Sequence, residues 1–138
     1  MRIIALPIIL MLDAGGAVAA DAVPYPVSDC GQLTVQMEIN AGAGANLEAA
    51  DAALNKVYQQ VMVHQSDTAS KNQLKDVERA WIAYRDRECA LEVGPQGDGG
   101  SIWPMEMSNC LEEKTATRIR ELTKLRGCIA GVSVCNPH

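Results

Sequence analysis

The sequence predicts an all-α protein, a three-helix antiparallel bundle in up-down-up order with disulfides and an irregular N-terminal arm. Apolar residues recur at three- and four-residue steps over three long segments, which is the period of an amphipathic helix. Glycine, proline and small polar residues separate these segments, as expected of turns. An alternating pattern that would suit a strand occurs only at residues 129–134.

The first twenty residues have the composition of a secretory signal peptide. Arg2 precedes an apolar run over residues 3–12, and small residues follow up to Ala20. The run is too short for a bilayer, which takes about 20 apolar residues. No cysteine follows the small residues to accept a lipid. We therefore expect cleavage of residues 1–20 and a periplasmic or secreted protein that is neither membrane-spanning nor a lipoprotein.

The remaining residues, 21–138, suffice for one modest domain. The chain carries a net charge of −5 at pH 7. This sign argues against nucleic acid as a partner, because phosphate binding requires a basic face. It is compatible with a cationic partner.

An irregular arm is predicted at residues 21–45, which are rich in proline and glycine and include Gly42 and Gly44. A helical domain is predicted over residues 46–126, with its first helix from about Asn46 to Gln65. Asn46 is a suitable N-cap for that helix. Its apolar stripe contains Leu47, Ala50, Leu54, Val57, Tyr58, Val61 and Met62.

A turn at residues 66–70 leads into a second helix from about Ser70 to Leu91. The glycine-rich stretch 94–100 separates it from a third helix, which starts near residues 104–108 and ends at Arg126. Gly127 is the predicted stop, and residues 127–138 form a short tail. The expected inward residues are Leu74, Val77, Trp81, Tyr84, Arg85 and Glu88, then Leu111, Thr115, Ile119, Leu122 and Leu125.

Helices joined by so short a turn must be antiparallel. A turn centred on Thr68 places Asp51 opposite Arg85, an acid against a base within two apolar stripes. We interpret the two residues as a structural ion pair that locks the hairpin. A role of the same pair in ligand binding is the alternative.

Five cysteines in an exported chain indicate disulfides rather than a metal site. No Cys-x-x-Cys occurs and the only histidines are His64 and His138, so zinc-ligand spacing is missing. The topology gathers Cys30, Cys89 and Cys110 at one end of the bundle. A Cys89–Cys110 bond would close the glycine-rich loop and contribute about 3 kcal/mol. We favour Cys30 bonded to one of the other two, which would tether the arm.

The sequence contains no catalytic signature. Gly-x-Ser-x-Gly, a phosphate-binding glycine loop and His-Glu-x-x-His are all missing. We therefore expect a binding protein rather than an enzyme, with no catalytic residues, metal or cofactor.

The sequence contains three blocks, around Leu54, Trp81 and Thr115, that together resemble the lysozyme-inhibitor LprI-like family of small exported bacterial proteins. The first contains Leu54, Asn55 and Tyr58, the second Trp81, Arg85 and Asp86, and the third, after Cys110, contains Thr115, Arg118 and Leu122. The resemblance covers residues 30–125. It implies a helical domain and, for some relatives, inhibition of lysozyme, but it carries over no inhibitory residues.

One departure from the family pattern concerns a cysteine. Thr34, Glu38 and Asn40 match that pattern, but Gly42 stands where the family has a second cysteine. The resemblance therefore implies that one family bridge is missing or rewired. Cys128 and Cys135 lie outside the shared region and are expected to pair with each other.

The charges are distributed unevenly along the chain. Residues 21–51 contain five acids and no base, and residues 114–126 contain five bases and one acid. Complementarity to the helix dipoles accounts for this pattern, and steering of a cationic partner is the alternative. We expect a lysozyme inhibitor that acts by steric occlusion. The alternative is an envelope structural or stress interaction module without inhibitory activity.

Overall fold

The computed structural model describes residues 35–131, and the helical prediction is confirmed there. Three long helices, α1 (Gln36–Val63), α2 (Thr68–Val93) and α4 (Trp103–Ile129), make up most of this range. A short helix α3 (Gln96–Gly99) and a 3-10 turn η2 (Gly100–Ile102) connect α2 to α4. Residues 35–131 contain no strand. The expected signal peptide, most of the expected arm, Cys30 and Cys135 lie outside this range.

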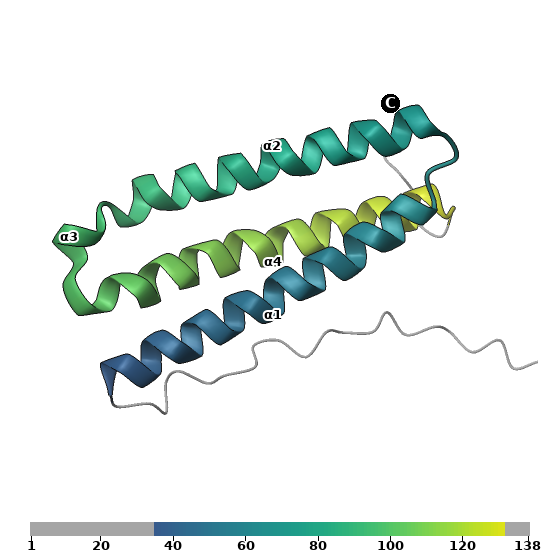
Figure 1. Cartoon of the computed structure of the whole chain (residues 1–138). Helices are drawn as coiled ribbons and strands as arrows, with labels where there is room; N and C mark the ends of the chain where they lie inside the picture. Colours follow the sequence, from purple (N-terminus) through teal and green to yellow (C-terminus); the bar gives the residue numbers. More distant parts are fainter. Residues whose placement is uncertain (1–34, 132–138) are drawn as a thin grey trace, which may run out of the picture.

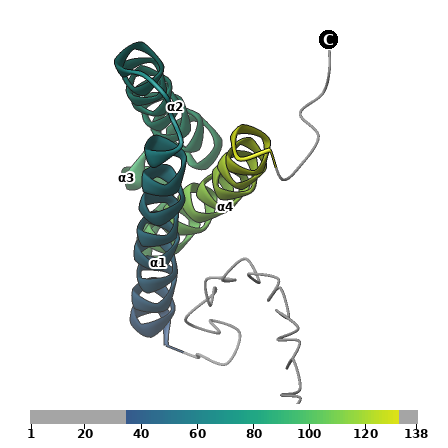
Figure 2. The ribbon, with the colours of Figure 1, turned by 90° about the vertical axis from the view of Figure 1, so that its right-hand side faces the viewer.

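The long helices run side by side with alternating direction (Figure 1). The connection that contains α3 lies at one end, together with the first turn of α1. The α1–α2 turn lies at the other end, beside the last turns of α4. We call these the loop end and the turn end. Figure 2 shows that the helix axes are inclined to one another rather than parallel.

Helix α1 begins at Gln36 rather than near Asn46, so the expected irregular arm is helical from residue 36 onward. Glycine disfavours a helix by about 1 kcal/mol per residue. Tertiary packing outweighs that cost, because Gly42 and Ala43 are buried. The first turns of α1 are also bonded to the connection between α2 and α4, where Asn40 Nδ2 donates to the Ser101 carbonyl over 2.9 Å.

The closest packing in the molecule joins α1 and α4. Half of the buried residues of α1 are small, which allows α4 to approach: Gly42, Ala43, Ala50 and Ala53. Larger apolar side chains form the core toward the turn end, where Leu54, Val57, Val61, Leu74 and Leu122 pack together. The hydrophobic core therefore draws on all three long helices, and α1 contributes the most side chains to it.

Helix α2 has the largest share of exposed residues among the three long helices. Only Leu74, Glu78 and Cys89 are buried along it. Val77 and Tyr84 were expected to face inward, but they are 45% and 57% exposed. The expectation was wrong because α2 contacts the bundle over a narrower arc than a fully packed helix does. Asp67 caps its start by accepting from the Ser70 amide over 2.8 Å, and Gly94 ends it with a φ of 77°.

Helix α4 continues through Gly127 to Ile129, so Gly127 is not the stop that the sequence suggested. The chain turns at Gly131, which has a φ of 70°. Leu125, expected to face inward, is 39% exposed near this end. At the other end, Trp103 Nε1 donates to the Gly94 carbonyl over 3.0 Å and ties the start of α4 to the end of α2.

The disulfide at the loop end joins Cys89 to Cys110, with 5.7 Å between their Cα atoms. The expected bond from Cys30 to one of these cysteines is therefore wrong. Cys89 is fully buried, and the bond closes the connection between α2 and α4. Cys128 is disulfide-bonded as well. Its expected partner, Cys135, lies outside the described residues.

Candidate functional site

The middle of the bundle contains a polar layer centred on Arg85. Its Nη1 lies 2.9 Å from Asp51 Oδ1 on α1 and donates over 2.9 Å to Thr115 Oγ1 on α4. Its Nε lies 3.0 Å from Asp86 Oδ1 on α2 itself. The side chain of Arg85 is 11% exposed, so these partners replace most of its water. The juxtaposition of Asp51 and Arg85 follows from the antiparallel register of the hairpin.

Trp81 lies between two arginines in the neighbouring layer. The guanidinium carbons of Arg85 and Arg118 are 5.3 and 5.8 Å from the centroid of its ring, within the range of cation–π interactions. Arg118 also binds Glu78, with 3.1 Å between Nε and Oε1. Both of these side chains are mostly buried, at 15% and 10% exposure. The α2–α4 interface is thus held largely by polar and ionic contacts.

The ion pairs between α2 and α4 raise the pKa of two basic groups. Burial alone would lower the pKa of Arg118, but its hydrogen bonds to Glu78 and Glu121 prevail and raise the pKa above its ordinary value. The hydrogen bond from Lys114 to Glu92 over 2.7 Å likewise raises the pKa of the Lys114 ammonium group. Both cations are therefore charged throughout the physiological pH range.

Glu78 and Lys114 are not among the candidate site residues that the sequence predicted. A signal for Glu78 is present, because it follows Leu74 by four residues and so falls on the buried stripe of α2. An acid on a buried stripe needs a cationic partner. Its partner on α4 becomes evident only when the packing of α2 on α4 is known.

The residues that carry the family resemblance divide into three groups. Leu54, Thr115 and Leu122 are buried, and Trp81, Arg118 and Asp86 belong to the polar layers. Asn55 and Tyr58 face a groove between α1 and α2. Asn55 is exposed, so packing does not require an amide at this position.

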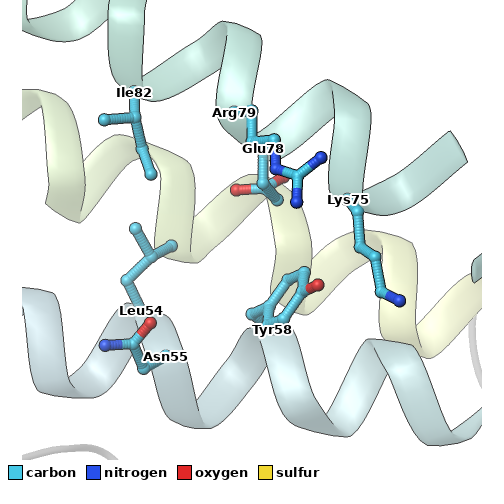
Figure 3. Close-up of a pocket in the computed structure, with 7 residues that line it drawn as sticks. All are labelled: Leu54, Asn55, Tyr58, Lys75, Glu78, Arg79 and Ile82. Atoms are coloured by element: carbon cyan, nitrogen blue, oxygen red, sulfur yellow. The ribbon is translucent and has the colours of Figure 1, made fainter. Parts of the chain in front are cut away.

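The groove has a volume of about 340 Å³ and is open to solvent (Figure 3). Leu54, Asn55 and Tyr58 reach into it from α1. The residues that line it from α2 are Lys75, Glu78, Arg79 and Ile82. It lies between α1 and α2, whose backbones stay farther apart than those of α1 and α4 although the side chains of Asp51 and Arg85 bridge them.

The bundle is electrically polarised along its length. The layer of Asp51, Arg85 and Thr115 marks the middle of the three helices. Toward the loop end, residues 35–50 and 84–113 contain nine acids and two bases. Residues 51–83 and 114–131, toward the turn end, contain nine bases and five acids.

Two neighbouring acids toward the loop end, Glu112 and Glu113, interact with each other. Desolvation, together with the charge of Glu113, raises the pKa of Glu112 above its ordinary value. Glu112 and Glu113 thus form an acidic spot on α4, whereas the nearby acids Glu88 and Glu92 are bound by Lys114. A cationic partner would relieve this repulsion.

Two negative findings apply to residues 35–131. No cluster of three or more histidine, cysteine or acidic residues there could hold a metal ion. No helix in this part of the chain is long and apolar enough to cross a membrane.

The sequence is similar to a known family and to two curated proteins. A model of the family described as lysozyme inhibitor LprI matches residues 29–122. The chain is 38% identical to the uncharacterized protein R02472 of Rhizobium meliloti (strain 1021), over 72% of this chain and 80% of that protein. It is 33% identical to the uncharacterized protein YecT of Escherichia coli (strain K12), over 55% of each chain. No solved structure gave a significant match.

Proposed function

The chain belongs to the lysozyme inhibitor LprI family, and we propose that it is an exported protein that binds a lysozyme and occludes its substrate cleft. The family match is the observation that carries this proposal. A signal-like leader and a disulfide-bonded helical domain support export. Inhibition by occlusion requires shape and charge but no chemistry of the inhibitor's own.

We assign the partner-facing surface to the loop end. Many lysozymes are strongly cationic, and the loop end concentrates the acids of the described chain. Glu48, Glu106 and Glu113 are exposed there. The disulfide and the hydrogen bond from Trp103 to Gly94 hold this end in shape, which lowers the entropy lost on binding.

A lysis assay tests the proposal. Purified protein is titrated against a panel of lysozymes of different classes, and clearing of a bacterial suspension is followed by turbidity. We expect protection to saturate near one protein per lysozyme for at least one class. Binding to an envelope component without protection against any class would favour the alternative, an interaction module.

Charge reversal tests the assigned surface. Glu113→Lys reverses one charge at the loop end, and Asp76→Lys makes the same change toward the turn end, at an exposed site on α2. We expect a several-fold slower association with lysozyme for Glu113→Lys and little change for Asp76→Lys. Equal effects of the two variants would show that the loop end does not face the partner.

A further inference from the structure

The groove between α1 and α2 contains polar groups that the fold does not use. Among residues 35–131, no hydrogen bond or ion pair engages the Asn55 amide, the Tyr58 hydroxyl or the Lys75 ammonium group. Figure 3 shows all three beside the cavity. These groups are therefore available to a ligand.

The charge on the α2 wall is positive. Lys71, Lys75 and Arg79 follow one another at four-residue steps, so they lie on one face of the helix. The acid among the lining residues, Glu78, is engaged by Arg118. Arg79 faces Asp76 at 3.6 Å, but both side chains are more than three-quarters exposed, so that pair neutralises little of the charge.

Apolar side chains complete the groove. Leu54 is 7% exposed, and Ile82 on the opposite wall is 43% exposed although it lines a cavity. The volume of about 340 Å³ is at the lower end of the range for ligand sites. An aliphatic side chain placed between Leu54 and Ile82 would remove apolar surface from water.

We propose that this groove binds an acidic peptide segment that carries one apolar side chain. The carboxylates of the segment bind Lys75 and Arg79, its backbone bonds to the Asn55 amide, and its apolar side chain fills the space beside Ile82. The same charges repel a cationic protein. The site is therefore distinct from the acidic loop end assigned to lysozyme, and neither site depends on the other.

Titration with a defined peptide tests the site. The probe is the N-acetylated peptide Glu-Glu-Leu-Glu-Glu, and binding is followed by amide chemical shifts of the full-length protein. We expect shifts at Asn55 and Ile82, and roughly fivefold weaker binding to Lys75→Glu. Arg87→Glu is the matched control, because Arg87 is exposed on another face of α2 and its reversal changes the net charge equally.

Three outcomes would overturn the proposal. The first is no shift at the groove up to millimolar peptide. The second is equal weakening by Lys75→Glu and Arg87→Glu. The third is equal affinity for Glu-Glu-Gly-Glu-Glu, which lacks the apolar side chain and would reveal charge attraction alone. Lysozyme inhibition by Lys75→Glu should equal that of the parent protein, which separates this test from that of the loop end.

Discussion

Arg85 connects the three long helices through a single side chain. Its guanidinium group binds Asp51 on α1, Asp86 on α2 and Thr115 on α4, and its carbon lies over the ring of Trp81. Side chains of all three long helices therefore meet at this group. Because Arg85 contacts residues of all three long helices, we propose that its role is structural.

Replacement of Arg85 by methionine tests that role. The variant leaves Asp51 and Thr115 without their cation, so we expect it to lose about 2 kcal/mol of unfolding free energy, given that Asp51 remains half exposed. Urea denaturation measures the loss. Arg79→Met, at an exposed site, should change the stability little. An Arg85→Met variant of unchanged stability that no longer bound its partner would instead assign the pair to binding.

Asp67 makes the stability of helix α2 depend on pH. Hydrogen bonds from the Ser70 amide and hydroxyl, and from the Ser66 hydroxyl, hold the pKa of its carboxyl below the ordinary 3.8. Because the folded-state pKa is the lower one, the stabilisation is complete above about pH 3.8 and is lost as the pH falls through the folded-state value.

The contribution of Asp67 can be isolated with Asp67→Asn, which keeps an acceptor but cannot titrate. We expect the thermal midpoints of the parent and the variant to converge as the pH is lowered from about 5 to 2, because only the parent loses this contribution. Calorimetry across that range provides the comparison. A difference that stays constant down to the lowest pH would contradict the assignment.

The helices themselves were largely predictable, but their ends were not. Periodicity identified three helices, and the register placed Asp51 against Arg85. The ends depend on contacts that a local pattern does not contain. Gly42 is helical because α1 is buried there, and α4 passes through Gly127 to turn at Gly131. Tertiary burial can override the helix-breaking tendency of a single glycine.

The connection between α2 and α4 depends on its disulfide. The bond joins Cys89 to Cys110 across a separation of 21 residues, and by the loop-entropy model it contributes about 3 kcal/mol. We expect the double variant Cys89→Ala/Cys110→Ala to lose about that much in urea denaturation. Reduction of the parent protein should produce at least this loss, because it also breaks the disulfide of Cys128. Equal stability of the reduced and oxidised forms would show that native contacts alone hold the connection.

The excess of acids at the loop end makes association with a cationic partner dependent on ionic strength. Surface charges act over about 8 Å at physiological salt and over about 30 Å at 0.01 M. We therefore expect association with lysozyme to slow by roughly tenfold between these conditions, with a smaller change in dissociation. Stopped-flow kinetics measures both rates. Salt-insensitive inhibition would exclude steering by the acidic loop end.

The acidic N-terminal region was predictable from the sequence, but the groove was not. The acids of α1 are visible as a run without bases, and the topology brings the acids of residues 84–113 to the same end. The groove depends on how far α2 stands from α1, which is set by packing on α4. Nothing in the sequence pattern therefore distinguishes Lys75 and Arg79 from solvated charges on a helix surface. Asn55 entered only through the family pattern.

The unequal burial of the helices implies unequal local stability. Helices α1 and α4 pack closely against each other, whereas α2 is mostly exposed and is held by ion pairs and by a disulfide at one end. Amide hydrogens of α2 near the α1–α2 turn should therefore exchange with deuterium sooner than those of α1 and α4. Local opening of α2 would therefore begin next to the α1–α2 turn, near Thr68, and would be limited at the other end by the disulfide at Cys89.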